Sequence, residues 1–331
     1  MLSQKYKQVF ILGSGFSKSV SSIMPTLKEL TEDLKQLKDK TNFNELSGFI
    51  SETLSVTNNL DEVNTIENIS SVILSKGLFY NNEEKIYYDI LRHQLMRWIF
   101  ERIEATFPEV DDGKKEQLIR FFKQHSFTAG EKPPEEPALF ITFNYDLLLE
   151  RLLQSDNINN WYFDYIIRLN HYGTKKQKKI QEQNQVFEYL KLHGSLNWFT
   201  APGADRNDLS NVYLIEDQDP SKQLIHLKDI PVYIPMAFAK SEFFIGSLYN
   251  VLWNIARRCL EEAEEINFIG YGFPQTDMDN LFFFLRYKSK IKNIVIQEPD
   301  ESYKIKRLKK LFPASNIINR DAFEFISKQY L

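Results

Sequence analysis

Short apolar runs that end at glycine or polar residues recur along the chain. They cover residues 8–12, 138–143, 187–192, 266–269, 293–297 and 316–318. Most of these runs are rich in β-branched and aromatic residues, which predicts short buried strands. Between them, apolar residues recur every three or four positions, which predicts helices at 147–153, 276–287 and 301–311, among others. Strands that alternate with helices predict an α/β fold, with a Rossmann-like, mostly parallel sheet and helices on both faces.

Helical spacing dominates the part of the chain that follows the first strand. Segments 27–37, 61–74, 83–104 and 114–125 all show it. We therefore expect a single domain over residues 1–331 that contains a large helical insertion or layer at 30–125. The longest predicted helix covers 241–264, with Ser241 as its N-cap. The lysine-rich segment 173–185 is interpreted as a solvated surface loop.

Charge and cysteine content narrow the class of protein. Lys and Arg number 41 against 45 Asp and Glu, for a net charge of -4, so we expect no direct nucleic-acid binding by bulk charge. The one cysteine, Cys259, excludes a disulfide scaffold and a zinc ribbon built from cysteines. The N-terminal apolar run is too short for a signal peptide, and no helical stretch reaches the roughly 20 apolar residues of a membrane span. We therefore expect a cytoplasmic protein that makes no membrane contact.

Glycine and polar clusters follow five of the predicted strands, at 13–15, 144–146, 193–195, 270–272 and 297–298. Because ligands of parallel sheets bind outside the carboxyl ends of the strands, we expect these clusters to converge on one site. Gly13-Ser14-Gly15 opens like a dinucleotide-binding turn but lacks the third glycine of the usual pattern. Taken alone, it is equally compatible with a plain tight turn.

Five motifs together resemble the sirtuin-like (silent information regulator two-like) superfamily. They are GSGFS at 13–17, MPT at 24–26, TFNYD at 142–146, LHGSLNW at 192–198 and GYGFPQTD at 270–277. More narrowly, the chain resembles zinc-free bacterial members found in antiphage defence, several of which hydrolyse NAD. The segments 30–125 and 155–185 lie outside these motifs.

The resemblance implies a set of residues that bind NAD. In the glycine turns and at one strand end these are Gly13, Ser14, Gly15, Phe16, Ser17, Gly270, Tyr271, Gly272, Asp277, Gln297 and Glu298. The first turn would line the phosphates, with Phe16 at the mouth near the nicotinamide. Gln297 and Glu298 would contact the adenosine ribose. Gly272 stands where many sirtuins have Ser or Thr, so one hydroxyl contact would be missing.

Asn144, Asp146 and His193 are the catalytic candidates that the resemblance implies. Asn144 can orient a water, and His193, with an ordinary pKa near 6.5, can accept a proton at neutral pH. Asp146 can stabilise developing positive charge or bind a ribose hydroxyl. The alternatives are structural: Asn144 and Asp146 are also typical helix-capping residues, and a histidine outside such a motif is more often a core residue.

The resemblance implies an NAD glycohydrolase that releases nicotinamide and ADP-ribose, with NAD as substrate and no metal. Such an enzyme would deplete NAD in abortive infection. Without the cysteine ribbon, water is the expected acceptor in place of an acyl-lysine. The alternatives are a subunit that binds NAD or ADP-ribose without turnover, and an NAD-dependent protein deacylase or ADP-ribosyltransferase.

Regulation would require partners, because a constantly active enzyme of this kind would be toxic. By analogy with the family we expect a homo-oligomer and a possible ring-shaped ATPase partner of the HerA type. The chain has no P-loop motif, so that ATPase would be a separate chain.

Overall fold

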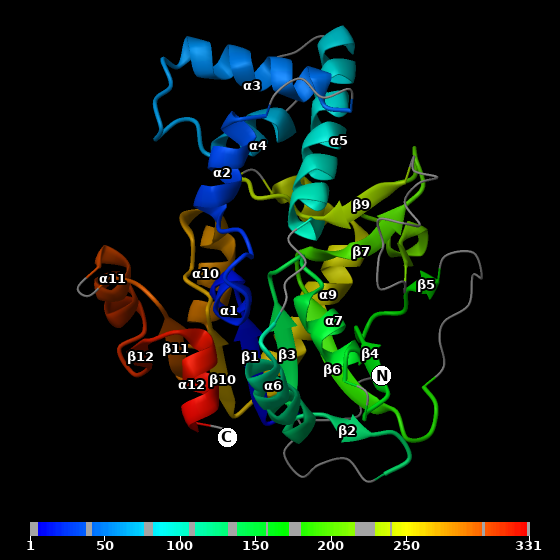
Figure 1. Cartoon of the computed structure of the whole chain (residues 1–331), viewed down its shortest axis with the longest axis vertical. Coiled ribbons are helices and arrows are strands. Elements are labelled where there is room, and N and C mark those ends of the chain that lie inside the picture. The colour runs from blue at the N-terminus through cyan, green and yellow to red at the C-terminus, as the bar shows by residue number, and fades with distance from the viewer. Residues whose placement is uncertain are drawn as a thin grey trace.

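The computed structural model describes residues 6–37, 42–75, 82–105, 110–131, 138–156, 158–171, 180–215, 229–238, 240–299 and 302–329. Figure 1 shows a part built around a large sheet, with a group of helices beyond one end of it. Most of the lysine-rich loop expected at 173–185 lies outside the described residues.

The large sheet has a parallel core of six strands in the order β12-β11-β10-β1-β3-β6. These strands are β1 (Gln8–Leu12), β3 (Ala138–Thr142), β6 (Gln185–Lys191), β10 (Glu265–Ile269), β11 (Ile291–Ile296) and β12 (Asn316–Asn319). Two short strands, β2 (Phe127–Thr128) and β4 (Trp161–Asp164), pair with β6, and only β2 is antiparallel. The chain starts at β1, builds outward to β6, then returns to β10 and builds the other way. The switch point between β1 and β10 is the usual ligand position in such sheets.

Helices cover both faces of this sheet. Phe10 of β1 and Asn267 of β10 are register partners, so Phe268 points to the opposite face from Phe10. Phe10 packs against Phe121 of α6 (Asp112–Gln124), with ring centroids 5.5 Å apart. Phe268 packs against Phe284 of α10 (Met278–Leu285), at 4.9 Å. The predicted α/β fold, with a mostly parallel sheet between two helical layers, is confirmed.

Further helices complete the two layers. Beside α6 lie α1 (Ser14–Val20), α7 (Leu148–Gln154) and α12 (Ala322–Gln329). Beside α10 lies α9 (Ser247–Glu262), whose Trp253 ring is 5.0 Å from Phe283. At the outer end of the sheet, α11 (Tyr303–Leu311) contacts β12. Short 3-10 turns are η1 (Leu209–Asn211), η3 (Ser241–Ile245) and η4 (Gln275–Asp277).

A second core joins the helices between β1 and β3 to a smaller sheet. The helices are α2 (Leu27–Lys35), α3 (Asn44–Val56), α4 (Ile66–Leu74) and α5 (Asn82–Glu104). The smaller sheet has the order β5-β8-β7-β9, with β5 (Asn170–His171), β8 (Tyr213–Leu214), β7 (Gly194–Thr200) and β9 (Ile230–Tyr233). Phe199 of β7 packs on Phe100 of α5 at 6.1 Å, and the Tyr233 hydroxyl donates to the Met96 carbonyl. The sequence predicted α2, α4 and α5 and indicated a strand at 231–234, which matches β9, but it predicted neither α3 as a separate helix nor this sheet. The single domain over 1–331 with an insertion at 30–125 stays a prediction.

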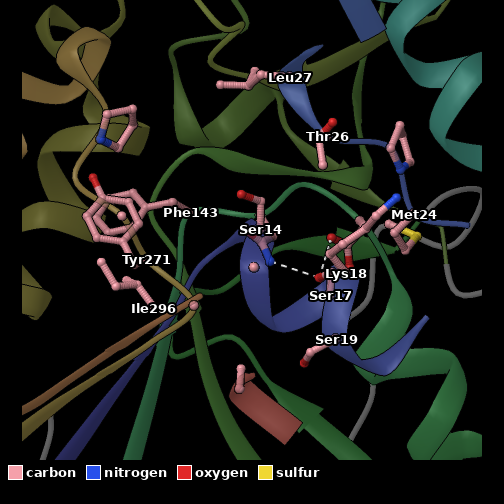
Figure 2. A pocket seen from close by; sticks show the side chains of 18 of the residues that line it. Ser14, Ser17, Lys18, Ser19, Met24, Thr26, Leu27, Phe143, Tyr271 and Ile296 are labelled. Carbon is pink, nitrogen blue, oxygen red and sulfur yellow. Dashed lines mark hydrogen bonds between the residues drawn. The ribbon is translucent and has the colours of Figure 1, made fainter. Parts of the chain in front are cut away.

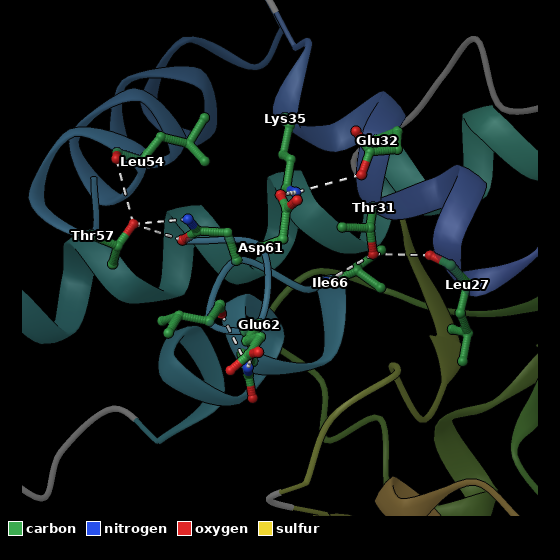
Figure 3. Close-up of polar contacts among 12 residues, drawn as sticks. Leu27, Thr31, Glu32, Lys35, Leu54, Thr57, Asp61, Glu62 and Ile66 are labelled. Atoms are coloured by element: carbon green, nitrogen blue, oxygen red, sulfur yellow. Dashed lines mark hydrogen bonds and ion pairs between the residues drawn. The ribbon is translucent and has the colours of Figure 1, made fainter. Parts of the chain in front are cut away.

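Polar contacts fix α2 to the start of α4 (Figure 3). The Thr31 hydroxyl donates to the Leu27 carbonyl at 2.9 Å and accepts from the Ile66 amide at 3.1 Å. Lys35 pairs with Asp61 at 2.7 Å. These contacts matter for the site, because the first turn of α2 lines the cavity described below.

The helix predicted at 241–264 begins later than expected, and the assignment of Ser241 as its N-cap is wrong. The α-helix begins at Ser247, with Gly246 as its N-cap. The Leu248 amide donates to the Asn207 carbonyl at 2.9 Å, and a Cβ on Gly246 would lie 2.2 Å from the Asn207 Cβ. This tertiary contact fixes where the helix begins. Within the described residues, no helix is both long and apolar enough to cross a membrane.

Candidate functional site

A cavity of about 450 Å³ opens at the switch point between β1 and β10 (Figure 2). Most of the site residues predicted from sequence line it: Ser14, Gly15, Ser17, Asn144, Asp146, His193, Gly270, Tyr271, Gly272, Asp277, Gln297 and Glu298. They come from segments up to 284 positions apart in the chain, between Ser14 and Glu298. The expected convergence at the carboxyl ends of the strands is therefore present.

The two glycine turns touch backbone to backbone at the base of the cavity. The Gly15 amide donates to the Gly270 carbonyl at 2.9 Å, and the Gly13 amide donates to the Ile269 carbonyl at 3.1 Å. Gly270 has φ +72, and a Cβ there would lie 2.1 Å from the Phe16 nitrogen. Only glycine permits this approach without strain or displacement. The Gly13 backbone lies behind the cavity wall and packs against Gly270 and Tyr271.

Phe16 does not stand at the mouth of the cavity, so this prediction is wrong. Its side chain is buried in the core, where its ring meets Phe122 of α6 at 6.2 Å. The residue lies on α1, and helical geometry turns its side chain toward α6 while Ser17 faces the cavity.

Asn144 and Asp146 are joined through the hydroxyl of Ser17. The Asn144 Nδ2 donates to Ser17 Oγ at 2.9 Å, and Ser17 Oγ donates to Asp146 Oδ2 at 2.9 Å. The backbone amide of Asn144 donates to Thr142 Oγ1 at 3.0 Å, and the Thr142 hydroxyl donates to the Leu12 carbonyl at 3.0 Å. These hydrogen bonds tie the side chains of Asn144 and Asp146 to the ends of β1 and β3.

Buried neighbours anchor the loop that carries these polar groups. Tyr145 and Leu147 belong to the second core, and Tyr145 also lines the cavity between Asn144 and Asp146. The contacts with Ser17 hold the two polar side chains at the cavity. Asp146 Oδ1 also accepts the Leu148 amide at 3.1 Å, but the N-cap of α7 is Leu147 and no side chain caps this helix, so neither Asn144 nor Asp146 is its N-cap.

His193 lies in an aromatic setting that suppresses its charge. Its ring centroid is 4.9 Å from that of Phe143 and 6.5 Å from that of Tyr145. Burial and the nearby Lys240 ammonium lower the pKa of His193 to about 3, against the opposing effect of Asp277. The ordinary pKa near 6.5 assumed from sequence is therefore wrong here: His193 is neutral at physiological pH. Its Nε2 is buried and has no hydrogen-bond partner within the described residues.

The glycine that follows His193 is required by its surroundings. Gly194 has φ +81, and a Cβ there would lie 2.3 Å from the Val232 carbonyl oxygen of β9. The chain turns at this point from β6 into β7, which pairs with β9. His193 is thereby held at the junction of the two sheets.

A buried ion pair closes the side of the cavity next to His193. Lys240 Nζ pairs with Asp277 Oδ1, and the Tyr271 hydroxyl donates to Asp277 Oδ2 at 2.9 Å. Burial opposes ionisation of Asp277, but the Lys240 ammonium and the hydrogen bonds from Lys240 and Tyr271 hold its pKa below the usual value. Sequence reasoning found Asp277 and missed Lys240, which follows an irregular segment without any motif.

The opposite end of the cavity is charged and more open. Glu298 pairs with Lys304 of α11, whose Nζ lies 3.4 Å from the position that a Cβ on Gly272 would take. Arg320, Asp321 and Ala322, which follow β12, also line this end. Sequence reasoning missed these three residues, although the strand-end rule that found the other clusters applies equally to the last strand.

Apolar side chains form the remaining wall. Met24, Leu27 and Leu30 come from the start of the helical part, Ile103 from the end of α5, and Met236 from the segment after β9. The MPT motif at 24–26 lies within this wall. Among the described residues, no group of three or more His, Cys, Asp or Glu side chains could hold a metal ion.

Comparison with known proteins places this chain in a family. The SIR2-like domain family matches residues 138–318, which is more than half of the chain. The chain therefore belongs to the SIR2-like domain family. A search of curated proteins finds no match to it.

Several solved structures of Sir2 proteins are similar to this chain. The match to a Sir2 homologue in complex with NAD has 16% identity and a TM-score of 0.47, and it covers 98% of this chain and 88% of the homologue. The match to a Sir2 homologue mutant in complex with ADP-ribose also has 16% identity, with a TM-score of 0.48, and covers 98% of this chain and 90% of the mutant. The match to a structure that addresses sirtuin substrate affinity has 12% identity and a TM-score of 0.45, and covers 99% of this chain and 94% of that protein.

Proposed function

We propose that this chain binds NAD in the cavity and hydrolyses it to nicotinamide and ADP-ribose. One observation carries the proposal. In a chain of the SIR2-like family, Asn144, Asp146 and His193 line the same cavity as both glycine turns, at the switch point of a Rossmann-like sheet. The solved Sir2 homologue complexes with NAD and ADP-ribose agree with this choice of ligand.

The cavity residues fit the parts of a dinucleotide. Glu298 and Gln297 would bind the adenosine ribose, as expected from sequence, with Lys304 and Arg320 as nearby cations for the phosphates. The exposed backbone of Ser14 and Gly15 allows close approach of a pyrophosphate. The buried Nε2 of His193, which has no partner among the residues that the structure describes, favours a polar ligand group, because an unsatisfied buried polar atom costs about 1–3 kcal/mol.

The proposed reaction breaks the bond between the ribose C1′ and the nicotinamide nitrogen. Nicotinamide leaves with the bonding electron pair, the oxygen of a water bonds to C1′, and that water loses one proton to the bulk solvent. Asn144, held by Ser17, would orient the water. Asp146 would stabilise the positive charge that develops on the ribose. Neutral His193 would accept a hydrogen bond from a ribose hydroxyl or from the water.

Water is the proposed acceptor in place of an acyl-lysine. The sequence has one cysteine and so cannot form the zinc ribbon of deacylating sirtuins. The face of the cavity next to His193 carries the buried Lys240 and Asp277 pair, which a neutral acyl chain would have to desolvate further.

Nicotinamide release from NAD tests the proposal. Purified wild-type protein should release it, Asn144→Ala should lose most of the rate, and Asn211→Ala, in the 3-10 turn η1, should keep it. Equal rates from wild type and Asn144→Ala would remove Asn144 from the mechanism. No release from wild type, alone or with candidate partners, would end the hydrolase proposal.

A second candidate function is binding of NAD or ADP-ribose without turnover. The low pKa of His193 favours it, because a histidine with a pKa of about 3 is a weak base at neutral pH. Calorimetric titration separates the two functions: tight binding of NAD with no nicotinamide formed identifies a sensor or assembly subunit.

For the cellular role we propose NAD depletion in antiphage defence, in the cytoplasm, by a homo-oligomer. A ring-shaped ATPase of the HerA type is the proposed partner. Support comes from the sequence resemblance and from exposed apolar side chains on α5, where Ile86 is 65% and Ile90 is 40% exposed. Light scattering with and without candidate partner proteins tests the assembly, and a strict monomer with full activity would contradict it.

A further inference from the structure

A lysine ammonium is buried directly behind the loop that carries Asn144 and Asp146. Lys191 is the last residue of β6 and is fully buried. Its Nζ donates to the Asp146 carbonyl at 2.6 Å, to Glu150 Oε1 at 2.9 Å and to the Tyr145 carbonyl at 3.4 Å. All three ammonium hydrogens therefore have acceptors.

Removing this charge from water costs desolvation free energy, which the interactions of Lys191 with its partners must offset. An ammonium out of water costs several kcal/mol in real proteins, by order of magnitude, unless it is paired and hydrogen-bonded. Glu150, on α7, supplies the opposite charge and is itself 5% exposed as a side chain. Two of the three hydrogen bonds from Lys191, however, go to main-chain carbonyls of the loop that carries Asn144 and Asp146, and only one goes to the Glu150 carboxylate.

The network extends away from the cavity. The Tyr165 hydroxyl donates to Glu150 Oε1 at 3.2 Å, and the Asn197 Nδ2 donates to the Tyr165 oxygen at 3.1 Å. Asn197 lies on β7, so the network links β6, α7 and the second sheet behind the loop. A loop held by a network from three elements has little freedom to move.

We propose that Lys191 is a positioning residue for the reaction, acting on Asn144 and Asp146 through the main chain of their loop. The loop is held from the cavity side by Ser17 and from the interior by Lys191. Lys191 also lies two residues before His193, so one strand end sets the distance between the histidine and the loop. This inference rests on the proposed hydrolysis of NAD.

The test removes both charges and keeps both shapes. In Lys191→Met with Glu150→Gln, the side-chain lengths stay similar, and no unpaired charge is left in the core. Because a displacement near 1 Å at a reacting group costs on the order of 10²-fold in rate, we expect kcat to fall by about that factor. KM should change by less than about threefold, because the groups that bind the dinucleotide ends are untouched.

A partly buried ion pair away from the loop supplies the matched control. Arg151 of α7 pairs with Glu104 of α5, and their side chains are 10% and 9% exposed. Arg151→Met with Glu104→Gln removes a pair that joins two helices instead of the loop. The control should keep kcat within about threefold. Equal losses of kcat in both double variants, or unchanged kcat in the Lys191 variant, would overturn the proposal.

A single variant separates the charge pair from the loop contact. Glu150→Gln alone keeps an oxygen acceptor for Lys191 and Tyr165 but leaves the buried ammonium without a carboxylate, so we expect lower stability than in the double variant, while the folded protein keeps most of kcat. If it instead folds and loses as much kcat as the double variant, the charge pair and not the loop contact would matter, and the proposal would be wrong.

Crystal structures separate this inference from the proposed function. If wild-type protein releases no nicotinamide, hydrolysis fails, but the position of the loop still tests Lys191. Loss of the hydrogen bond between Asn144 and Ser17 in the Lys191→Met, Glu150→Gln variant supports the positioning role. An unchanged loop in that variant refutes it whatever the wild-type activity.

Discussion

Substitution of Gly270 by alanine tests whether the contact between the two glycine turns builds the site. Gly270 has φ +72, and an added Cβ would lie 2.1 Å from the Phe16 nitrogen and 2.6 Å from the Gly15 carbonyl carbon. Both neighbours are backbone atoms, so no side-chain rotation can relieve the clash. Either β10 or the start of α1 must move.

The expected loss of stability follows from two contributions. An alanine in the left-handed region costs about 1–2 kcal/mol. Displacement of α1 breaks the hydrogen bond from the Gly15 amide to the Gly270 carbonyl, worth about 1 kcal/mol, and disturbs the packing around it. We expect the free energy of unfolding to fall by about 3 kcal/mol in total.

Urea unfolding followed by circular dichroism measures the change. Gly48→Ala in α3 is the control, because nothing lies within 4 Å of its added Cβ. Alanine in a helix interior should stabilise that variant by about 0.5–1 kcal/mol. The same glycine-to-alanine change thus has opposite signs at the two positions. A Gly270→Ala protein as stable as wild type would refute the backbone-contact argument.

Three further predictions follow from the site and the core. Ser17→Ala removes the hydrogen bond from Asn144 to Ser17 and the one from Ser17 to Asp146, so nicotinamide release should fall by about tenfold or more; an unchanged rate would contradict this. Because the pKa of His193 is about 3, kcat/KM should show no inflection of this group from pH 8 to 5, whereas a step near 6.5 would refute its burial. Burial raises the pKa of Glu188 from 4.5 to about 7, so the folded state holds this proton more tightly than the unfolded chain does. The contribution of this protonated group to stability is full below pH 4.5 and is lost as the pH rises to about 7. In urea unfolding, the free energy of unfolding of Glu188→Gln should therefore exceed that of wild type by up to about 3 kcal/mol at pH 8 and equal it at pH 4. Equal stability of the two proteins at both pH values would contradict this.

Strand positions were predictable because they depend on local pattern. The runs at 8–12, 138–143 and 266–269 each match an observed strand to within one residue at each end. Their apolar character reflects burial on both faces of a parallel sheet, which the sequence records directly. The strand-end rule then located most of the cavity.

Side-chain direction on short elements was not predictable in the same way. Phe16 and Ser17 are neighbours in one motif, yet one is in the core and the other in the cavity. The phase of a seven-residue helix against its neighbours decides this, and that phase is set by packing with α6. The start of α9 was missed for a related reason, since Asn207, about 40 residues earlier, fixes it.

The sequence by itself determined the alternation of strands and helices, the positions of the glycine turns and the identity of the polar groups that follow each strand. These depend on residues close together in the chain. Only the tertiary structure decided the charge state of His193, the presence of Lys240 beside it, and the burial of Lys191 behind Asp146. The physical reason is that desolvation and ion pairing depend on which distant segments exclude water from a group, and local sequence does not record that.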